Sequence, residues 1–414
     1  MSEQKTHFRK RVRDWLGGIV LGAAAAGLIV SATAADLGDF ERIAPFNPQA
    51  MWLMKQARAI IETYQVDSAE KPAEEDKLLY GAIKGMVEAW GDPYTRFVDP
   101  GQLKEEEIEM EGEYGGLGIY IGQRDGKTLV ISPIEDTPAD RVGLKPQDQI
   151  VKIEDEIILG WDSQQVVKRL RGKPGTSVTI WVRREGEEEL LKFEIVRENI
   201  KLISVRSEMM DKNLGYVKIS QFKQKTAHEV RSAFSALMKE GAKGFVLDLR
   251  NNGGGLLNGA VEICDMFLNG GLVVGMKGRV DRANDEIYAN PGTLTSLPMV
   301  VLINEGSASA SEIVAGALSD RGRAVSVGKK TFGKGSVQTL FNLTDGSGLY
   351  VTIARYHTPS GKVIDHVGLE PDVEVDGEVT KEKDKDEQLK RALEELRNII
   401  SGKSAPAAKL PEAS

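Results

Sequence analysis

The chain has 414 residues, 41% of them hydrophobic and 28% charged, a composition typical of a globular protein of two or three domains. Its formal net charge of −8 disfavours a polyanion such as nucleic acid as a partner. A single cysteine, Cys264, excludes a disulfide within one chain, and the apolar pattern around it predicts a buried structural thiol.

The first 35 residues differ from the rest of the chain. Basic residues between positions 9 and 13 precede an apolar run at 15–30 and a stretch of small residues at 31–35. This order, with an A-x-A site at Ala32 and Ala34, predicts a secretory signal over residues 1–35. The alternative is a membrane anchor formed by residues 15–30, although that run is slightly shorter than the roughly 20 residues a spanning helix needs. In either case we expect the folded part to lie outside the cytoplasm, in the periplasm, the cell envelope or the medium.

Residues 36–111 are predicted to be a helical region. Apolar side chains recur at three- and four-residue spacing within 51–64 and again within 78–90, with a charged loop at 68–76 between them. Gly and Pro at 91–93 and 99–101 are expected to end the helical section. Packing against the rest of the protein is the expected role of these helices, and a lid or a dimer arm stays open.

Residues 112–199 change to short β-rich runs with one helical segment at 163–170, which predicts a separate domain. The stretch 114–119 resembles the carboxylate-binding loop of a PDZ domain, and the stretch 137–150 is similar to the helix-turn-strand signature of that family. Glycines let consecutive N–H groups converge on an anion, and an exposed strand edge can add a peptide as one more strand. The resemblance implies that a substrate C-terminus binds at the loop formed by Gly115, Gly116, Leu117, Gly118 and Ile119. The alternative interpretation of this glycine-rich stretch is a plain hairpin turn.

Strands and helices alternate over residues 200–375, which predicts an α/β domain. Strands are expected at 214–219, 244–249, 299–303 and 324–327, helices at 226–239, 256–267 and 311–318, and a β pair at 337–343 and 348–355. Residues 376–400 are expected to form a charged helix, and the Ala/Pro/Ser-rich residues 401–414 a disordered tail.

Ser309 lies between the apolar strand at 299–303 and the helix at 311–318. A tight strand-to-helix turn exposes a nucleophile, and the helix N-terminus stabilises the negative charge that develops during its attack. The N–H of Ala310 would then be directed at an oxyanion. The alternative is structural, because Ser309 and Glu312 fit the S-x-x-E capping box of a helix.

Lys334 lies between Gly333 and Gly335, where close backbone packing can desolvate its amine and lower its pKa. Gln338 follows in a predicted strand and shares a face with Lys334 by the period of two, so it could fix the amine. A surface lysine in a turn is the ordinary alternative. The stretch 328–335 also approaches a nucleotide-binding P-loop, but Gly335 replaces the required Ser/Thr and a strand follows instead of a helix, which disfavours that interpretation.

A third motif, residues 248–255, contains three glycines directly before a predicted helix. Such a turn can hold the N–H of Gly254 or Gly255 toward an oxyanion, while Asp248, Arg250 and Asn251 could brace it. The histidines show no metal-ligand spacing, so we expect no zinc and no other cofactor. A Ser-His-Asp triad with His228 or His357 is conceivable, but neither residue has a recognisable context.

The three motifs in this order, behind a PDZ-like segment and a secretory leader, resemble the carboxyl-terminal processing proteases, also called tail-specific proteases. The resemblance extends from about residue 50 to 375 and includes the stretch 356–361. It implies a crotonase- and Clp-like layered α/β protease core with an inserted PDZ domain that gates access. It also implies that Ser309 is the nucleophile, Lys334 the general base and Gln338 its orienting partner, with Ala310 and Gly254 or Gly255 in the oxyanion hole.

The resemblance thus predicts an extracytoplasmic serine endopeptidase that acts on proteins with free, apolar C-termini and forms an acyl-enzyme. The alternative is a PDZ scaffold fused to an inactive protease-like domain, in which Ser309 only caps its helix. A homodimer through the terminal helices and a regulatory or adaptor protein stay open as partners.

Overall fold

The structure is a computed structural model that describes residues 47–66 and 74–403, except residues 125, 135, 212, 378 and 381 and the side chain at position 164. The predicted leader and nearly all of the predicted tail lie outside these residues. No helix in the described ranges is long and apolar enough to cross a membrane.

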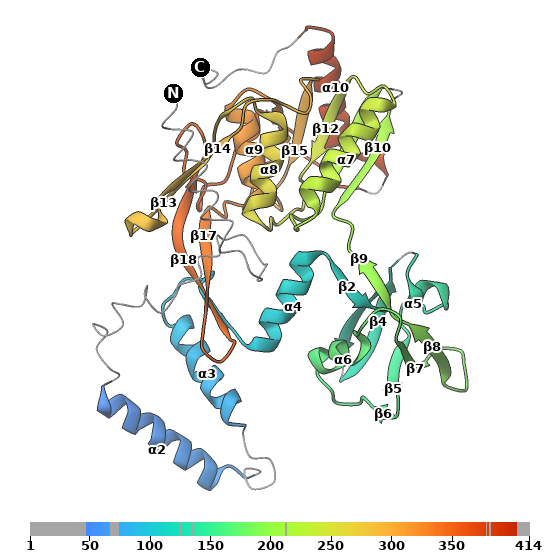
Figure 1. Ribbon diagram of the computed structural model, residues 1–414, viewed down its shortest axis with the longest axis vertical. Helices are drawn as coiled ribbons and strands as arrows, with labels where there is room; N and C mark the ends of the chain where they lie inside the picture. The colour runs from blue at the N-terminus through green and yellow to red at the C-terminus, as the bar shows by residue number, and fades with distance from the viewer. Residues whose placement is uncertain are drawn as a thin grey trace.

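A six-stranded sheet forms the centre of the largest domain (Figure 1). Its central strands β12 and β15 are buried on both faces, as parallel strands between two helical layers are. All neighbouring strands pair in parallel except β10, which is antiparallel to β11. The strand order is β10 (Val205–Met210), β11 (Leu214–Ile219), β12 (Gly244–Asp248), β15 (Met299–Ile303), β16 (Val325–Gly328) and β19 (Val373–Glu374).

Helices cover both faces of this sheet. Phe245 and Leu247 pack with α7, α8 and α9 on one face, whereas Val246 between them packs with α10 on the other, as the period of two along a strand requires. The layered α/β core expected from the sequence is therefore confirmed. The four helices are α7 (Thr226–Lys239), α8 (Leu257–Phe267), α9 (Ala310–Asp320) and α10 (Glu387–Ile400).

A second, antiparallel sheet lies beside α9 and carries the strand that follows Lys334. Its order is β1-β18-β13-β14, with β17 also paired to β18. The strands are β1 (Arg96–Val98), β13 (Gly271–Gly278), β14 (Asp285–Ala289), β17 (Ser336–Asn342) and β18 (Gly348–His357), and the short helix η3 (Asp281–Ala283) lies between β13 and β14. The predicted β pair is confirmed, whereas β1 and the β13–β14 hairpin were not predicted.

The PDZ-like part has its own apolar core and connects to the rest through α4 and β9 (Figure 1). One sheet has the order β3-β4-β5-β7-β8, with β6 on β5, and a second pairs β2 with β9. The strands are β2 (Glu113–Gly116), β3 (Ile119–Arg124), β4 (Lys127–Pro133), β5 (Gln149–Ile153), β6 (Glu156–Ile157), β7 (Ser177–Arg183), β8 (Leu191–Val196) and β9 (Glu198–Lys201), and the helices are α5 (Pro138–Arg141) and α6 (Ser163–Leu170).

The N-terminal region contains α2 (Pro48–Tyr64), α3 (Glu75–Glu88) and α4 (Pro100–Glu111). The expectation that residues 99–101 end the helical section was wrong, because they begin α4. Asp99 caps this helix by accepting a hydrogen bond from the N–H of Gln102 at 2.9 Å, and Pro100 occupies its first turn, where a missing N–H costs nothing.

The C-terminal helix is shorter than predicted. The short helix η4 (Lys383–Lys385) precedes it, and α10 begins only at Glu387, after the N-cap residue Asp386. The charge pattern indicated a helix, whereas the Asp386 side chain, which accepts a hydrogen bond from Leu389 N, decides where it starts.

Candidate active site

Ser309 occupies the N-cap position of α9, six residues after the end of β15. Its backbone has φ 55° and ψ −115°, a conformation that non-glycine residues rarely adopt and that costs of the order of 1–3 kcal/mol. The side chain is 2% exposed, and its Oγ makes no hydrogen bond. A strained backbone with an unpaired buried hydroxyl is what a nucleophile held ready for a ligand requires.

Glu312 connects the Ser309 turn to the Lys334 loop. Its carboxylate accepts hydrogen bonds from the N–H groups of Ser309, at 2.8 Å, and Lys334, at 2.9 Å. The N–H of Gly333 and the hydroxyl of Thr331 donate to the same carboxylate, at 2.8 and 2.5 Å. Burial raises the pKa of Glu312 above its usual range, although these four donors favour the charged form. The sequence indicated Glu312 only as a helix cap and missed this second role.

Lys334 is half-buried, and both flanking positions favour glycine, Gly335 for lack of space and Gly333 because its backbone has a φ of 88°. A Cβ at Gly335 would lie 2.1 Å from the backbone nitrogen of Asp365, and one at Gly333 would lie 3.0 Å from that of Gly368. Burial lowers the pKa of Lys334, the positive charge of Arg96 lowers it further, and Glu312 opposes the shift. The prediction of a desolvated lysine agrees with this environment.

The dyad is not joined by a hydrogen bond in this conformation. Ser309 Oγ has no partner, and Lys334 Nζ lies 4.9 Å from the centre of the Tyr94 ring. Gln338 lies in β17 as predicted, but its side-chain amide donates to Thr352 Oγ1 at 3.3 Å. Glu312 thus joins the backbones of Ser309 and Lys334, while the side chains of Lys334 and Gln338 have other contacts.

Gly254 packs directly against the Ser309 turn. A Cβ there would lie 2.8 Å from the carbonyl oxygen of Ala308 and 2.9 Å from Ser309 Cβ, so the turn admits only glycine. The N–H of Gly254 donates to the Asn252 side chain at 2.9 Å. By contrast, the N–H groups of Ala310 and Gly255 make no hydrogen bond within the described part of the chain. The N–H groups of Ala310 and Gly255 are therefore available to an oxyanion, whereas the N–H of Gly254 would first have to lose its hydrogen bond to Asn252.

Buried ion pairs brace the glycine turn. The Arg250 guanidinium donates twice to the Asp248 carboxylate, at 2.8 and 3.0 Å, and reaches Asp386 at 2.9 Å. All three side chains are at most 3% exposed. The bracing role of Asp248 and Arg250 was expected, whereas Asp386, 136 residues away in sequence, gave no local signal.

The PDZ-like part carries a small groove between its binding loop and α6. Leu117 and Gly118 form the turn, and Ile119 begins β3, which is an edge strand of its sheet. Gly115 and Gly116 lie in β2, where they pair with β9. The pocket, of about 50 Å³, is lined by Tyr114, Leu117, Gly118, Ile119, Ile121, Val167, Leu170 and Arg171. An open strand edge beside an apolar groove suits the addition of an extended peptide.

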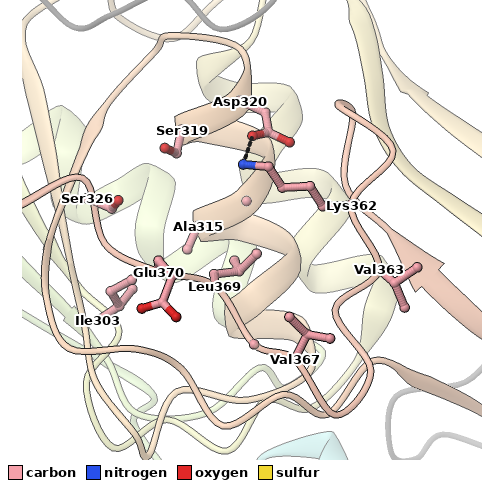
Figure 2. Close-up of a pocket in the computed structure, with 12 residues that line it drawn as sticks. Ile303, Ala315, Ser319, Asp320, Ser326, Lys362, Val363, Val367, Leu369 and Glu370 are labelled. Atoms are coloured by element: carbon pink, nitrogen blue, oxygen red, sulfur yellow. Dashed lines mark ion pairs between the residues drawn. The ribbon is translucent and has the colours of Figure 1, made fainter.

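A larger cavity, of about 430 Å³, lies along the C-terminal half of α9, where Figure 2 shows Ala315, Asp320 and Lys362 on its walls. Lys362 Nζ lies 3.8 Å from the Asp320 carboxylate. None of the predicted catalytic residues lines this cavity, so it does not hold the bond that Ser309 would attack.

The remaining candidates do not join the site. Cys264 is fully buried in α8, which raises the pKa of its thiol, so it is the structural residue expected. Within residues 47–66 and the described part of 74–403, no three His, Cys, Asp or Glu side chains form a group that could hold a metal ion. The strand β17 follows the 328–335 stretch, as the argument against a P-loop predicted.

Known proteins resemble this chain over most of its length. A model of peptidase family S41 matches residues 213–375, and a PDZ-domain model matches residues 115–195. The carboxy-terminal-processing protease of Bartonella bacilliformis is 40% identical over 335 residues, covering 80% of this chain and 76% of that protein. The carboxy-terminal processing protease CtpA of Bacillus subtilis is 36% identical over 303 residues, covering 73% of this chain. A solved structure titled photosystem II D1 C-terminal processing protease is 30% identical over 78% of this chain and 92% of its own, with a TM-score of 0.46.

The two family models place the chain among the PDZ-containing members of peptidase family S41. The chain belongs to the carboxyl-terminal processing proteases, which confirms the family predicted from its motifs. It spans 65% of the length of the Bacillus subtilis relative.

Proposed function

We propose that the protein is an extracytoplasmic serine endopeptidase that recognises substrate C-termini through its PDZ domain and cleaves peptide bonds with a Ser309/Lys334 dyad. The observation that carries the proposal is the unpaired Oγ of Ser309 in a strained turn, tied through Glu312 to the loop of a half-buried lysine. A scaffold with an inactive protease-like domain has no use for this strain or for the desolvation of Lys334.

In the proposed reaction, neutral Lys334 Nζ accepts the Ser309 Oγ proton as Oγ attacks the scissile carbonyl carbon. The N–H groups of Ala310 and of Gly254 or Gly255 stabilise the oxyanion. The Lys334 ammonium then donates its proton to the leaving amine, which leaves an ester on Ser309. Water then attacks the ester carbonyl while neutral Lys334 Nζ accepts a proton from that water, and the Lys334 ammonium returns the proton to Ser309 Oγ as the acid product leaves. Gln338 orients the amine once its amide leaves Thr352.

This reaction requires a hydrogen bond between Lys334 Nζ and Ser309 Oγ that the conformation described above does not contain, so in this proposal that conformation is a resting form. A peptide bound in the PDZ groove favours the assembled form only if it binds that form more tightly. One contact supports such coupling: Arg171, at the PDZ groove, pairs with Glu105 of α4, and α4 directly follows the segment that carries Tyr94.

Amidation of a substrate C-terminus is expected to reduce its cleavage at least about tenfold. The loss of carboxylate charge removes charge-assisted hydrogen bonds from the loop at 117–119, each worth about 1.5–3 kcal/mol. The measurement is kcat/KM for one apolar-ended peptide with a free or an amidated C-terminus. Equal rates would contradict carboxylate recognition, and Val167→Asp in the groove is the matched variant that should lower cleavage of the free peptide alone.

The same proposal includes self-association through the N-terminal helices. The helix α2 has no buried residue, and large apolar side chains of this helix are exposed: Met51, Trp52, Leu53, Met54, Ile60 and Ile61. We expect Trp52→Glu to shift the protein toward monomer in sedimentation velocity, because a charge on an apolar contact is costly. A sedimentation coefficient that does not change from parent to variant would argue against self-association through this surface.

A further inference from the structure

The segment that precedes α4 enters the active site. Tyr94 is held by the Asp92 carboxylate, which accepts a hydrogen bond from Tyr94 N at 3.0 Å and another from Thr95 Oγ1 at 2.6 Å. Thr95 Oγ1 in turn accepts a hydrogen bond from the N–H of Thr352 at 3.2 Å. Directly afterwards β1 pairs with β18, so the segment is fixed to the sheet that carries Gln338. The position of the Tyr94 backbone is thus determined by the protease core.

The Tyr94 ring contacts the cationic end of Lys334. The separation of 4.9 Å between Nζ and the ring centre is within the range in which the negative face of an aromatic ring attracts an ammonium. This attraction acts only on the protonated amine, whereas proton abstraction from Ser309 needs the neutral amine. The ring contact and the abstraction of the proton therefore favour different protonation states of Lys334.

The other charged groups around Lys334 do not replace this contact. Arg96 repels the ammonium and is itself held by the Glu106 carboxylate, at 2.7 and 2.9 Å. Glu312 attracts the ammonium, but its carboxylate already accepts four hydrogen bonds from the two catalytic loops. Burial raises the pKa of the Tyr94 hydroxyl, and the negative charges of Asp365, Glu312 and Asp92 raise it further, which keeps the hydroxyl neutral.

We infer that Tyr94 is a positioning residue that holds the Lys334 ammonium away from Ser309 in the resting enzyme, so that release of Lys334 from this ring is part of activation. The inference rests on the proposed role of Lys334 as general base. It assigns a restraining function to the N-terminal segment, which the family motifs around Ser309 and Lys334 do not include.

The test compares three residues at position 94 in the full-length protein. Tyr94→Leu removes the ring, Tyr94→Phe retains it without the hydroxyl, and 3,5-difluorophenylalanine retains its shape with a weaker negative face. We expect Tyr94→Leu to raise the basal kcat about two- to thirtyfold and to move the alkaline rise of the pH profile to lower pH by roughly 0.4–1.5 units. Tyr94→Phe should behave like the parent, and the difluorinated protein should lie between Phe and Leu.

A second readout does not depend on cleavage. In protein labelled with ¹³C-lysine, the ε-CH₂ signal of Lys334, assigned by its loss in Lys334→Ala, should be shifted upfield by the ring and should lose that shift in Tyr94→Leu. The upfield shift of the Lys334 signal should persist in the difluorinated protein, because the shape of the ring is unchanged. This protein replaces the Leu variant in the test if the Leu variant does not fold.

Three results would overturn the inference. They are an unshifted Lys334 signal in the parent, a kcat that falls in Tyr94→Leu, and a pH profile that is the same for Phe and difluorophenylalanine. Failure of the proposed function gives a different result, because Lys334→Ala would then cleave the peptide as fast as the parent.

Discussion

Lys334→Ala and Ser309→Ala are each expected to reduce peptide cleavage by roughly three orders of magnitude or more. Without the amine, no base near Ser309 removes its proton, and without the hydroxyl no acyl-enzyme forms. In the parent, the rate should rise with pH through an apparent pKa below that of a free lysine, because burial and Arg96 lower the pKa of Lys334 and only the neutral amine is active. The measurement is kcat/KM from pH 6 to 10 for the parent and both variants.

Lys334→Arg is the matched control, because an arginine keeps the positive charge and stays protonated throughout this pH range. It should be as inactive as Lys334→Ala, while the circular dichroism spectrum and melting temperature of both stay close to those of the parent. Full cleavage by a folded Lys334→Ala protein would remove Lys334 from the mechanism, whereas a folded parent that cleaves no peptide would support the scaffold alternative.

Arg250→Ala is expected to lower the free energy of unfolding by about 3–5 kcal/mol. The substitution leaves the carboxylates of Asp248 and Asp386 buried at no more than 3% exposure without their cationic partner. It also detaches the start of α10 from the glycine turn beside Ser309, so cleavage should fall as well. Urea unfolding followed by circular dichroism gives the free energy.

Arg397→Ala is the comparison, because Arg397 lies in α10, the helix whose N-cap residue Asp386 pairs with Arg250. Arg397 of α10 pairs with Asp211, but both side chains are about half exposed, so the loss should not exceed about 1 kcal/mol. An Arg250→Ala protein that unfolds at the same urea concentration as Arg397→Ala would show that the buried network does not support the active-site turn.

Local patterns predicted the elements around the site with small errors. The strand before Ser309 and the helix after it follow from an apolar run and a three- to four-residue period, so the strand-to-helix turn is a local property. The glycines on either side of Lys334 indicated close backbone packing, which the segment around Asp365 provides. The prediction that residues 99–101 end a helix was wrong, because a proline can either end a helix or occupy its first turn. The sequence does not distinguish these two cases until the N-cap residue is known.

Local patterns did not predict which distant side chains are in contact. Tyr94 and Lys334, or Arg250 and Asp386, are separated by well over 100 residues, and each pair is brought together by strand pairing or helix packing that no single segment specifies. Glu312 carried a correct local signal as a cap, but its second set of donors comes from a loop about 20 residues later. The side chains of Lys334 and Gln338 can each make more than one contact, and the sequence does not show which of these contacts has the lower free energy.

The sequence alone therefore determined most of the elements, the family and the candidates for the reactive groups, because these depend on residue type and on spacing within one turn or one strand. Only the tertiary structure decided that Ser309 Oγ is unpaired, that Lys334 contacts Tyr94 and that Glu312 joins the two loops. These contacts depend on the packing of β1, β17 and α9 against one another, and packing in a dense interior is settled by all neighbours together.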